Sequence, residues 1–137
     1  MEKNKILIDA DALIALYKTN DSLHKKTLAL SKKIESCPIY ISLFTVPEAA
    51  TVISYDMSQA TASDFLRKVR ERKLIWLPFE EKIKLLTDDI FLKQNKKGTS
   101  WFDCCNVALF RFYQLDAIFS FDKFYKRVGL KRIEELF

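Results

Sequence analysis

Four carboxylates in this 137-residue chain each lie within an apolar stretch, where an isolated charge is unfavourable. They are Asp9, Glu48, Asp103 and Asp122, and their neighbours are mostly Ile, Leu, Val, Ala, Trp and Phe. A buried carboxylate without a partner loses its hydration energy, so it must be paired, protonated or bound to a metal ion. If the fold gathers these four side chains, the sequence predicts a site for a divalent cation.

Each acid also has a purely structural explanation. Glu48 can close a capping box with Thr45, and Asp103 can do the same with Ser100. Three aspartates stand where they can cap a helix N-terminus: Asp9, Asp11 and Asp122. These explanations do not exclude function, because the start of a helix after a strand is also where an active-site acid lies.

Taken together, the acids favour metal chemistry. Two carboxylates about 4 Å apart repel by roughly 4 kcal/mol at an effective dielectric of about 20, so a cluster without Lys, Arg or His requires a cation. Oxygen ligands suit hard ions such as Mg²⁺ or Mn²⁺ rather than Zn²⁺. One or two such ions can activate a water and stabilise the displacement at a phosphoryl group.

Short apolar strands that alternate with helices are expected to position these acids. The expected strands are 5–8, 39–43, 74–77 and 117–120, with a short fifth edge strand at 130–133. The expected helices are 12–17, 21–36, 45–57, 59–73, 80–97, 100–113 and a short one from Asp122 to Gly129. The strands are apolar throughout, which predicts an α/β fold with a mostly parallel central sheet of four to five strands. Sites in such sheets form outside the carboxyl ends of the strands, where Asp9 and Asp122 are expected.

Length and charge indicate the class of partner. The length of the chain suits a single domain over residues 1–137. Its formal charge is +5 with a pI near 9.1, which weakly favours a polyanionic partner such as nucleic acid.

Other site classes have little support in the composition. The three cysteines form no disulfide framework or zinc motif, and the single histidine, His24, gives a Ser-His-Asp or Cys-His mechanism no basis. No apolar run reaches 18 residues, and Asp9 and Asp11 interrupt the first one. We therefore expect a cytoplasmic protein with no membrane partner.

The acids and their neighbours, in order, resemble the PIN-domain nucleases. The matching segments are Leu-Ile-Asp9-Ala-Asp11, Thr45-Val-Pro-Glu48, Trp-Phe-Asp103-Cys and Ile-Phe-Ser120-Phe-Asp122-Lys-Phe. The resemblance spans nearly the whole chain, and its joint order and spacing are more specific than any single segment. It implies an α/β/α sandwich that cuts RNA with Mg²⁺ or Mn²⁺.

Carried over by position, the resemblance implies that Asp9, Glu48, Asp103 and Asp122 are the catalytic, metal-binding acids. Three further residues are expected beside them: Asp11, Asn106 and Ser120. Asp11 departs from the family, which usually has Asn, Ser or Thr there, so it is either an extra ligand or only a helix cap. Three basic residues after the last acid are predicted to contact RNA phosphates: Lys123, Lys126 and Arg127.

The resemblance predicts a metal-dependent endoribonuclease in which a water attacks the phosphodiester, leaving a 5′-phosphate and a 3′-hydroxyl. Single-domain proteins of this kind resemble the toxin halves of VapBC-type toxin–antitoxin pairs, which implies a homodimer and a cognate antitoxin. Two alternatives stay open: a stand-alone RNA-processing PIN nuclease, and an inactive PIN-like module that binds RNA or protein. A receiver-like or phosphatase domain is disfavoured, because the third expected strand ends in Trp76-Leu77-Pro78 without a phospho-accepting Asp.

Overall fold

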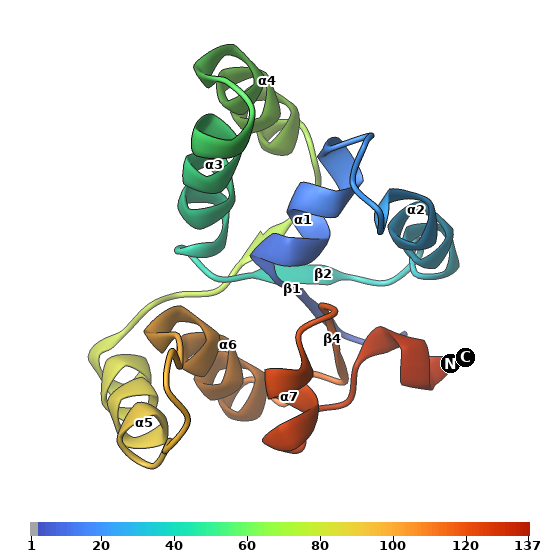
Figure 1. Cartoon of the computed structure of the whole chain (residues 1–137). Helices are drawn as coiled ribbons and strands as arrows, with labels where there is room; N and C mark the ends of the chain where they lie inside the picture. The colour runs from blue at the N-terminus through green and yellow to red at the C-terminus, as the bar shows by residue number, and fades with distance from the viewer. Residues whose placement is uncertain (1–2) are drawn as a thin grey trace.

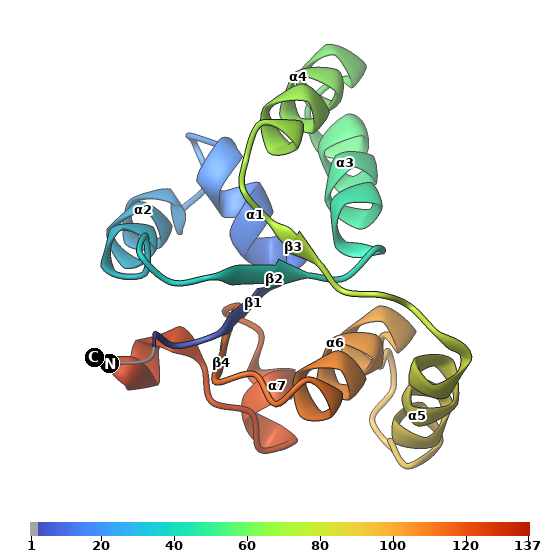
Figure 2. The same ribbon diagram turned by 180° about the vertical axis from the view of Figure 1, so that it is seen from behind.

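Four short parallel strands form the centre of the molecule, seen here in a computed structural model that describes residues 3–137. The strands are β1 (Ile6–Ile8), β2 (Ile39–Ile41), β3 (Ile75–Trp76) and β4 (Ala117–Phe119). Their order in the sheet is β3-β2-β1-β4; Figure 1 labels β1, β2 and β4, and Figure 2 also labels β3. Ile6 pairs with Ile39 on one side and with Ala117 on the other, so the first and last strands of the chain are neighbours. The predicted α/β fold with a parallel sheet is confirmed.

Helices cover both faces of the sheet, as apolar strands require. On one face lie α1 (Ala10–Tyr17), α2 (His24–Lys33), α3 (Thr45–Asp56) and α4 (Gln59–Arg70). On the other lie α5 (Glu81–Leu92), α6 (Trp101–Phe112) and α7 (Lys123–Arg127) (Figure 2). A 3₁₀ helix, Ile133–Leu136, follows α7. Among the described residues, no helix is long and apolar enough to cross a membrane.

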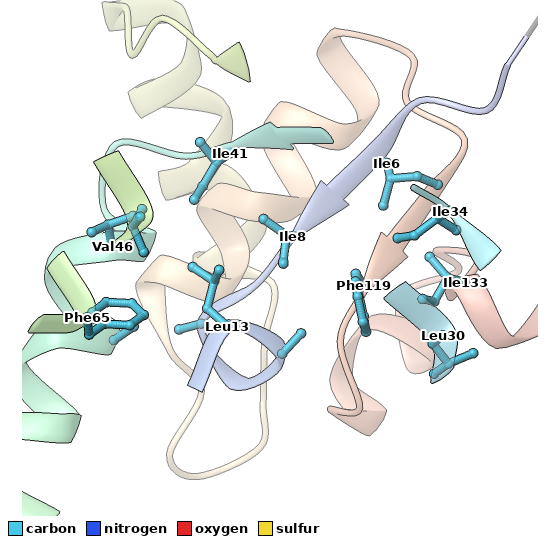
Figure 3. Packing of buried hydrophobic residues seen from close by; sticks show 14 of the residues in the cluster. Ile6, Ile8, Leu13, Leu30, Ile34, Ile41, Val46, Phe65, Phe119 and Ile133 are labelled. Carbon is cyan, nitrogen blue, oxygen red and sulfur yellow. The ribbon is translucent and has the colours of Figure 1, made fainter. Parts of the chain in front are cut away.

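The sheet separates two hydrophobic cores. The core under α1–α4 contains Ile6, Ile8, Leu13 and Phe65, which are at most 4% exposed (Figure 3). The core under α5–α7 contains alternate strand residues such as Leu7 together with helix residues from α6 and α7. Because successive strand side chains point to opposite faces, an uninterrupted apolar strand fills both cores at once.

Several elements differ from the expected ones. Helix α2 spans His24–Lys33 rather than 21–36, and helix α4 ends at Arg70 rather than at residue 73. Helix α5 ends at Leu92 instead of continuing to residue 97, and residues 93–100 form a loop. The fifth strand is reduced to one isolated bridge between Ile118 and Arg132. Helix α3 has no side-chain cap hydrogen bond, so the capping box expected from Thr45 and Glu48 is not formed, and the Glu48 carboxylate is not used in that way.

Candidate functional site

Asp9 is the centre of the site. It follows β1 and is 4% exposed, so its carboxylate is satisfied by the protein rather than by solvent. Its Oδ1 accepts hydrogen bonds from the Ala10 backbone N–H at 2.7 Å and from the Asn106 amide at 3.0 Å. Its Oδ2 accepts one from the Tyr125 hydroxyl at 2.7 Å, and the Ser120 hydroxyl lies 3.4 Å away. Asp9 is thus both the cap of α1 and a buried charge held by side chains from three distant segments.

Tyr125 links Asp9 to Asp103. Its hydroxyl lies 2.7 Å from Asp9 Oδ2 and 3.1 Å from Asp103 Oδ1, so these two carboxylate oxygens are at most 5.8 Å apart. The Asn106 amide donates to the same hydroxyl at 3.0 Å. A tyrosine hydroxyl carries one hydrogen, so it cannot donate fully to both carboxylates. The second contact is strongest when Asp103 holds a proton and donates it to the Tyr125 oxygen.

Ser120 repeats this arrangement on the other side of Asp9. Its hydroxyl lies 3.0 Å from Asp11 Oδ2 and 3.4 Å from Asp9 Oδ2, and it accepts a hydrogen bond from the Asp122 backbone N–H at 3.1 Å. Asp11 Oδ2 also accepts a hydrogen bond from the Phe121 backbone N–H at 2.8 Å. Asp11 therefore attaches the start of α1 to the loop after β4, besides accepting a hydrogen bond as a local cap would.

The other two predicted acids lie at the rim. Asp122 is exposed and caps α7 through a hydrogen bond from the Phe124 backbone N–H at 2.9 Å. Glu48, in the first turn of α3, is half-buried and forms no hydrogen bond through its side chain within residues 3–137. Each is close enough to the centre for its charge to affect the pKa of another acid in the site. The structure thus brings all four sequence-predicted acids around one point, together with Asp11, Asn106 and Ser120.

Burial and mutual repulsion dominate the electrostatics. Burial, and then the charge of Asp9, raises the pKa of Asp11 to about 7. Burial, followed by the charges of Asp9 and Asp122, raises the pKa of Asp103 to about 7. The pKa of Asp9 is raised mainly by burial, and that of Glu48 by burial and the Asp9 charge. The causes that raise these pKa values are burial and the charges of the other acids, so the carboxylates repel one another within the site.

The residues fit a hard divalent cation by their chemistry. All are oxygen donors, and the Asn106 Oδ1 atom is buried without a hydrogen-bond partner among the described residues. They do not form a ready-made coordination sphere: within residues 3–137, no group of three or more His, Cys, Asp or Glu side chains is arranged to hold a metal. The hydroxyls of Ser120 and Tyr125 lie between the carboxylates instead. A bound ion would therefore have to draw the acids closer together.

The predicted basic residues separate into two groups. Arg127 lines a cavity that also contains Asp103 and Asp122, whereas Lys123 and Lys126 are exposed and do not line it. Contact of Lys123 and Lys126 with RNA therefore stays a prediction. Two lysines that the sequence analysis did not single out, Lys96 and Lys97, line the same cavity.

Tyr125 is the site residue that sequence reasoning missed most clearly. It lies next to Phe124 in a short helix, so its position in the sequence is typical of a core aromatic residue. In the structure Tyr125 is indeed 0% exposed. The only available signal was its position three residues after Asp122, one turn along a helix from a predicted site acid. His24 lies outside the site and contacts the Ala15 carbonyl at 2.7 Å, and all three cysteines are free.

Comparison with solved structures agrees with this architecture. One similar structure is VapC20 of Mycobacterium tuberculosis, described as a Sarcin-Ricin loop cleaving toxin: the TM-score is 0.78 at 15% identity, covering 91% of this chain and 95% of that chain. Another is VapBC2 from Rickettsia felis bound to a DNA fragment from their promoter, with a TM-score of 0.67 at 12% identity, covering 93% and 96%. No sequence-family model and no curated protein matches the chain. The likeness shows that the chain has the PIN-like fold of VapC toxins.

Proposed function

We propose that the protein is a metal-dependent endoribonuclease and the toxin component of a toxin–antitoxin pair. One observation carries this proposal: acids from three other segments, Glu48, Asp103 and Asp122, lie around Asp9, and the charges within this group raise the pKa values of Asp9, Glu48 and Asp103. A purely structural role would not require that arrangement, because caps are satisfied singly. The PIN-like fold and the VapC20 likeness support the same reaction class.

Asp9, Asp103 and Asp122 would bind the ion, with Glu48 as a further ligand or as the residue that orients a water. When bound, Mg²⁺ or Mn²⁺ supplies an activated water and neutralises charge on the phosphate. The protein's own contribution is positional. Tyr125, Ser120 and Asn106 fix the Asp9 carboxylate from three sides, and Asp11 holds the loop that carries Asp122.

The partners follow from this proposal. A cognate antitoxin would cover the acidic cluster, consistent with the likeness to a VapBC structure, and a homodimer in the cytoplasm is expected. The stand-alone RNA-processing nuclease uses the same chemistry and differs only in lacking the antitoxin.

The PIN-like binding module is the second candidate, and one observation favours it: hydroxyl groups contact Asp9, Asp11 and Asp103, and the acids form no ready-made metal site in the described chain. Cleavage of a labelled single-stranded RNA by the purified protein, with Mn²⁺ and with EDTA, separates the two. The nuclease cleaves only with Mn²⁺, and Asp9→Asn loses cleavage while remaining folded by circular dichroism. Full activity in Asp9→Asn, or cleavage unchanged by EDTA, would refute the assignment; binding without cleavage would establish the module.

A further inference from the structure

A cavity of about 200 Å³ opens beside the acids, between α7 and the loop that joins α5 to α6. Its lining includes Asp103 and Asp122 and three cations, Lys96, Lys97 and Arg127. Within residues 3–137, none of these cations forms a salt bridge with any carboxylate. One cavity therefore carries negative and positive groups that do not neutralise each other directly.

The local structure explains why the cations face this cavity. Helix α5 ends at Leu92, and Gly98 adopts a left-handed backbone with φ +84°, which redirects the chain before α6 begins. The Thr99 hydroxyl donates to the Lys96 carbonyl at 2.7 Å and so fixes the turn. On the opposite wall the Arg127 guanidinium lies 5.8 Å from the centre of the Phe124 ring, a cation–π distance.

We propose that this cavity binds a phosphate of the RNA backbone adjacent to the bond that is cut, a proposal that rests on the nuclease function above. The acids occupy the wall nearest Asp9, where a divalent cation would be held. An anion placed between that cation and the three basic side chains would be attracted by both. Within residues 3–137, these side chains have no carboxylate partner in a salt bridge. Lysine ammonium groups are common point-charge partners of phosphate.

The size of the cavity agrees with such an occupant. One water needs about 10–15 Å³ of this kind of space, so a cavity of about 200 Å³ holds several waters or a hydrated anion. A phosphodiester group with part of its hydration shell fits that space. A phosphate held here would fix the position of the strand relative to the acids, and such a contact carries no sequence information.

Binding of RNA in a non-cleaving background tests this proposal. In Asp9→Asn protein, the Kd for a fluorescent single-stranded RNA is measured at several salt concentrations without metal. The variant Lys96→Gln/Lys97→Gln is compared with Lys25→Gln/Lys32→Gln, a matched pair of exposed α2 lysines on the other face of the sheet. Both pairs remove the same net charge.

The loop pair should weaken binding about 10-fold and lower the salt slope of log K by about 0.7, the value for one phosphate of a single strand. The control pair should change the Kd less than about 2-fold, and both variants should melt as their parent does. Equal effects in the two pairs would mean that only net charge matters, and no effect of the loop pair would show that the cavity does not bind the RNA. Either result overturns the proposal.

The same variants keep this proposal separable from the nuclease function. If the wild type does not cleave RNA but the loop pair still weakens binding selectively, the nuclease function fails and the cavity stands as an RNA-binding site. If the wild type cleaves and Lys96→Gln/Lys97→Gln, in the otherwise wild-type chain, binds and cleaves equally well, the phosphate site is wrong and the nuclease function stands.

Discussion

Replacing Asp11 with asparagine should stabilise the protein, and the gain should grow with pH. Asp11 is buried beside Asp9, and its pKa is raised to about 7 from an ordinary 3.8. The folded state thus holds this proton more tightly than the unfolded state does. Such a group contributes stability that is fully present below its unfolded pKa and is lost as the pH rises through the folded pKa. Asparagine has no proton to lose and still offers an oxygen to the Phe121 backbone N–H.

The size of the effect follows from the shift. A pKa raised from 3.8 to about 7 corresponds to about 4 kcal/mol of stability lost above pH 7, since each unit is 1.36 kcal/mol. About 1.5 kcal/mol of this is already lost at pH 5, so the difference between variant and wild type should widen by about 2–3 kcal/mol from pH 5 to pH 8. Comparing two pH values removes any constant effect of the substitution on the hydrogen bonds.

Urea unfolding in EDTA, followed by tryptophan fluorescence at both pH values, measures this difference. Asp89→Asn, at an exposed aspartate on α5, is the control for removing one carboxylate outside the cluster. A free-energy difference for Asp11→Asn that stays constant within about 0.5 kcal/mol would refute the reasoning, because Asp11 would then carry no burial penalty.

Two further predictions concern the same cluster. Tyr125→Phe keeps the ring but removes a buried donor to a carboxylate, so the free energy of unfolding should fall by about 1.5–3 kcal/mol. Its Mn²⁺ affinity by titration calorimetry should weaken about 10-fold, and equal or tighter binding would contradict this positioning role. Mn²⁺ at about 100 times its Kd should stabilise the wild type by about 2.7 kcal/mol in a thermal melt. EDTA should reverse that gain and Asp9→Asn should lack it; a wild type that does not respond to Mn²⁺ would exclude an ion at these acids.

The sequence predicts the strands well, together with the position of Asp9 and Asp122 beyond their carboxyl ends, and for one reason. Ile6-Leu7-Ile8 is apolar at every position, which indicates a strand covered on both faces, and parallel strands end at one edge. Asp9 and Asp122 follow directly from that geometry. The contact between Asp11 and Ser120 could not be predicted in this way. It depends on β1 and β4 being neighbours in the sheet, although they lie near opposite ends of the sequence.

The cavity and the tyrosine could not be predicted for different reasons. Residues 93–97 are polar and mostly good helix formers, so propensity extends α5 to Gly98. Residues 93–97 include no apolar side chain that could pack against the protein, and the helix ends at Leu92. Lys96 and Lys97 therefore lie in the loop rather than on the helix. Tyr125 is indistinguishable from a core aromatic until its hydroxyl is seen between two carboxylates.

The pairing of β1 with β4 has a consequence for synthesis on the ribosome. The partners of Asp9 on Asn106, Ser120 and Tyr125 are made long after Asp9 itself, so an emerging chain that stops before residue 117 lacks both β4 and α7. Bringing together segments so far apart in the sequence costs conformational entropy, and this slows folding. On the proposed nuclease function, activity would arise only when translation of this region is finished, and prematurely terminated products would not cleave RNA.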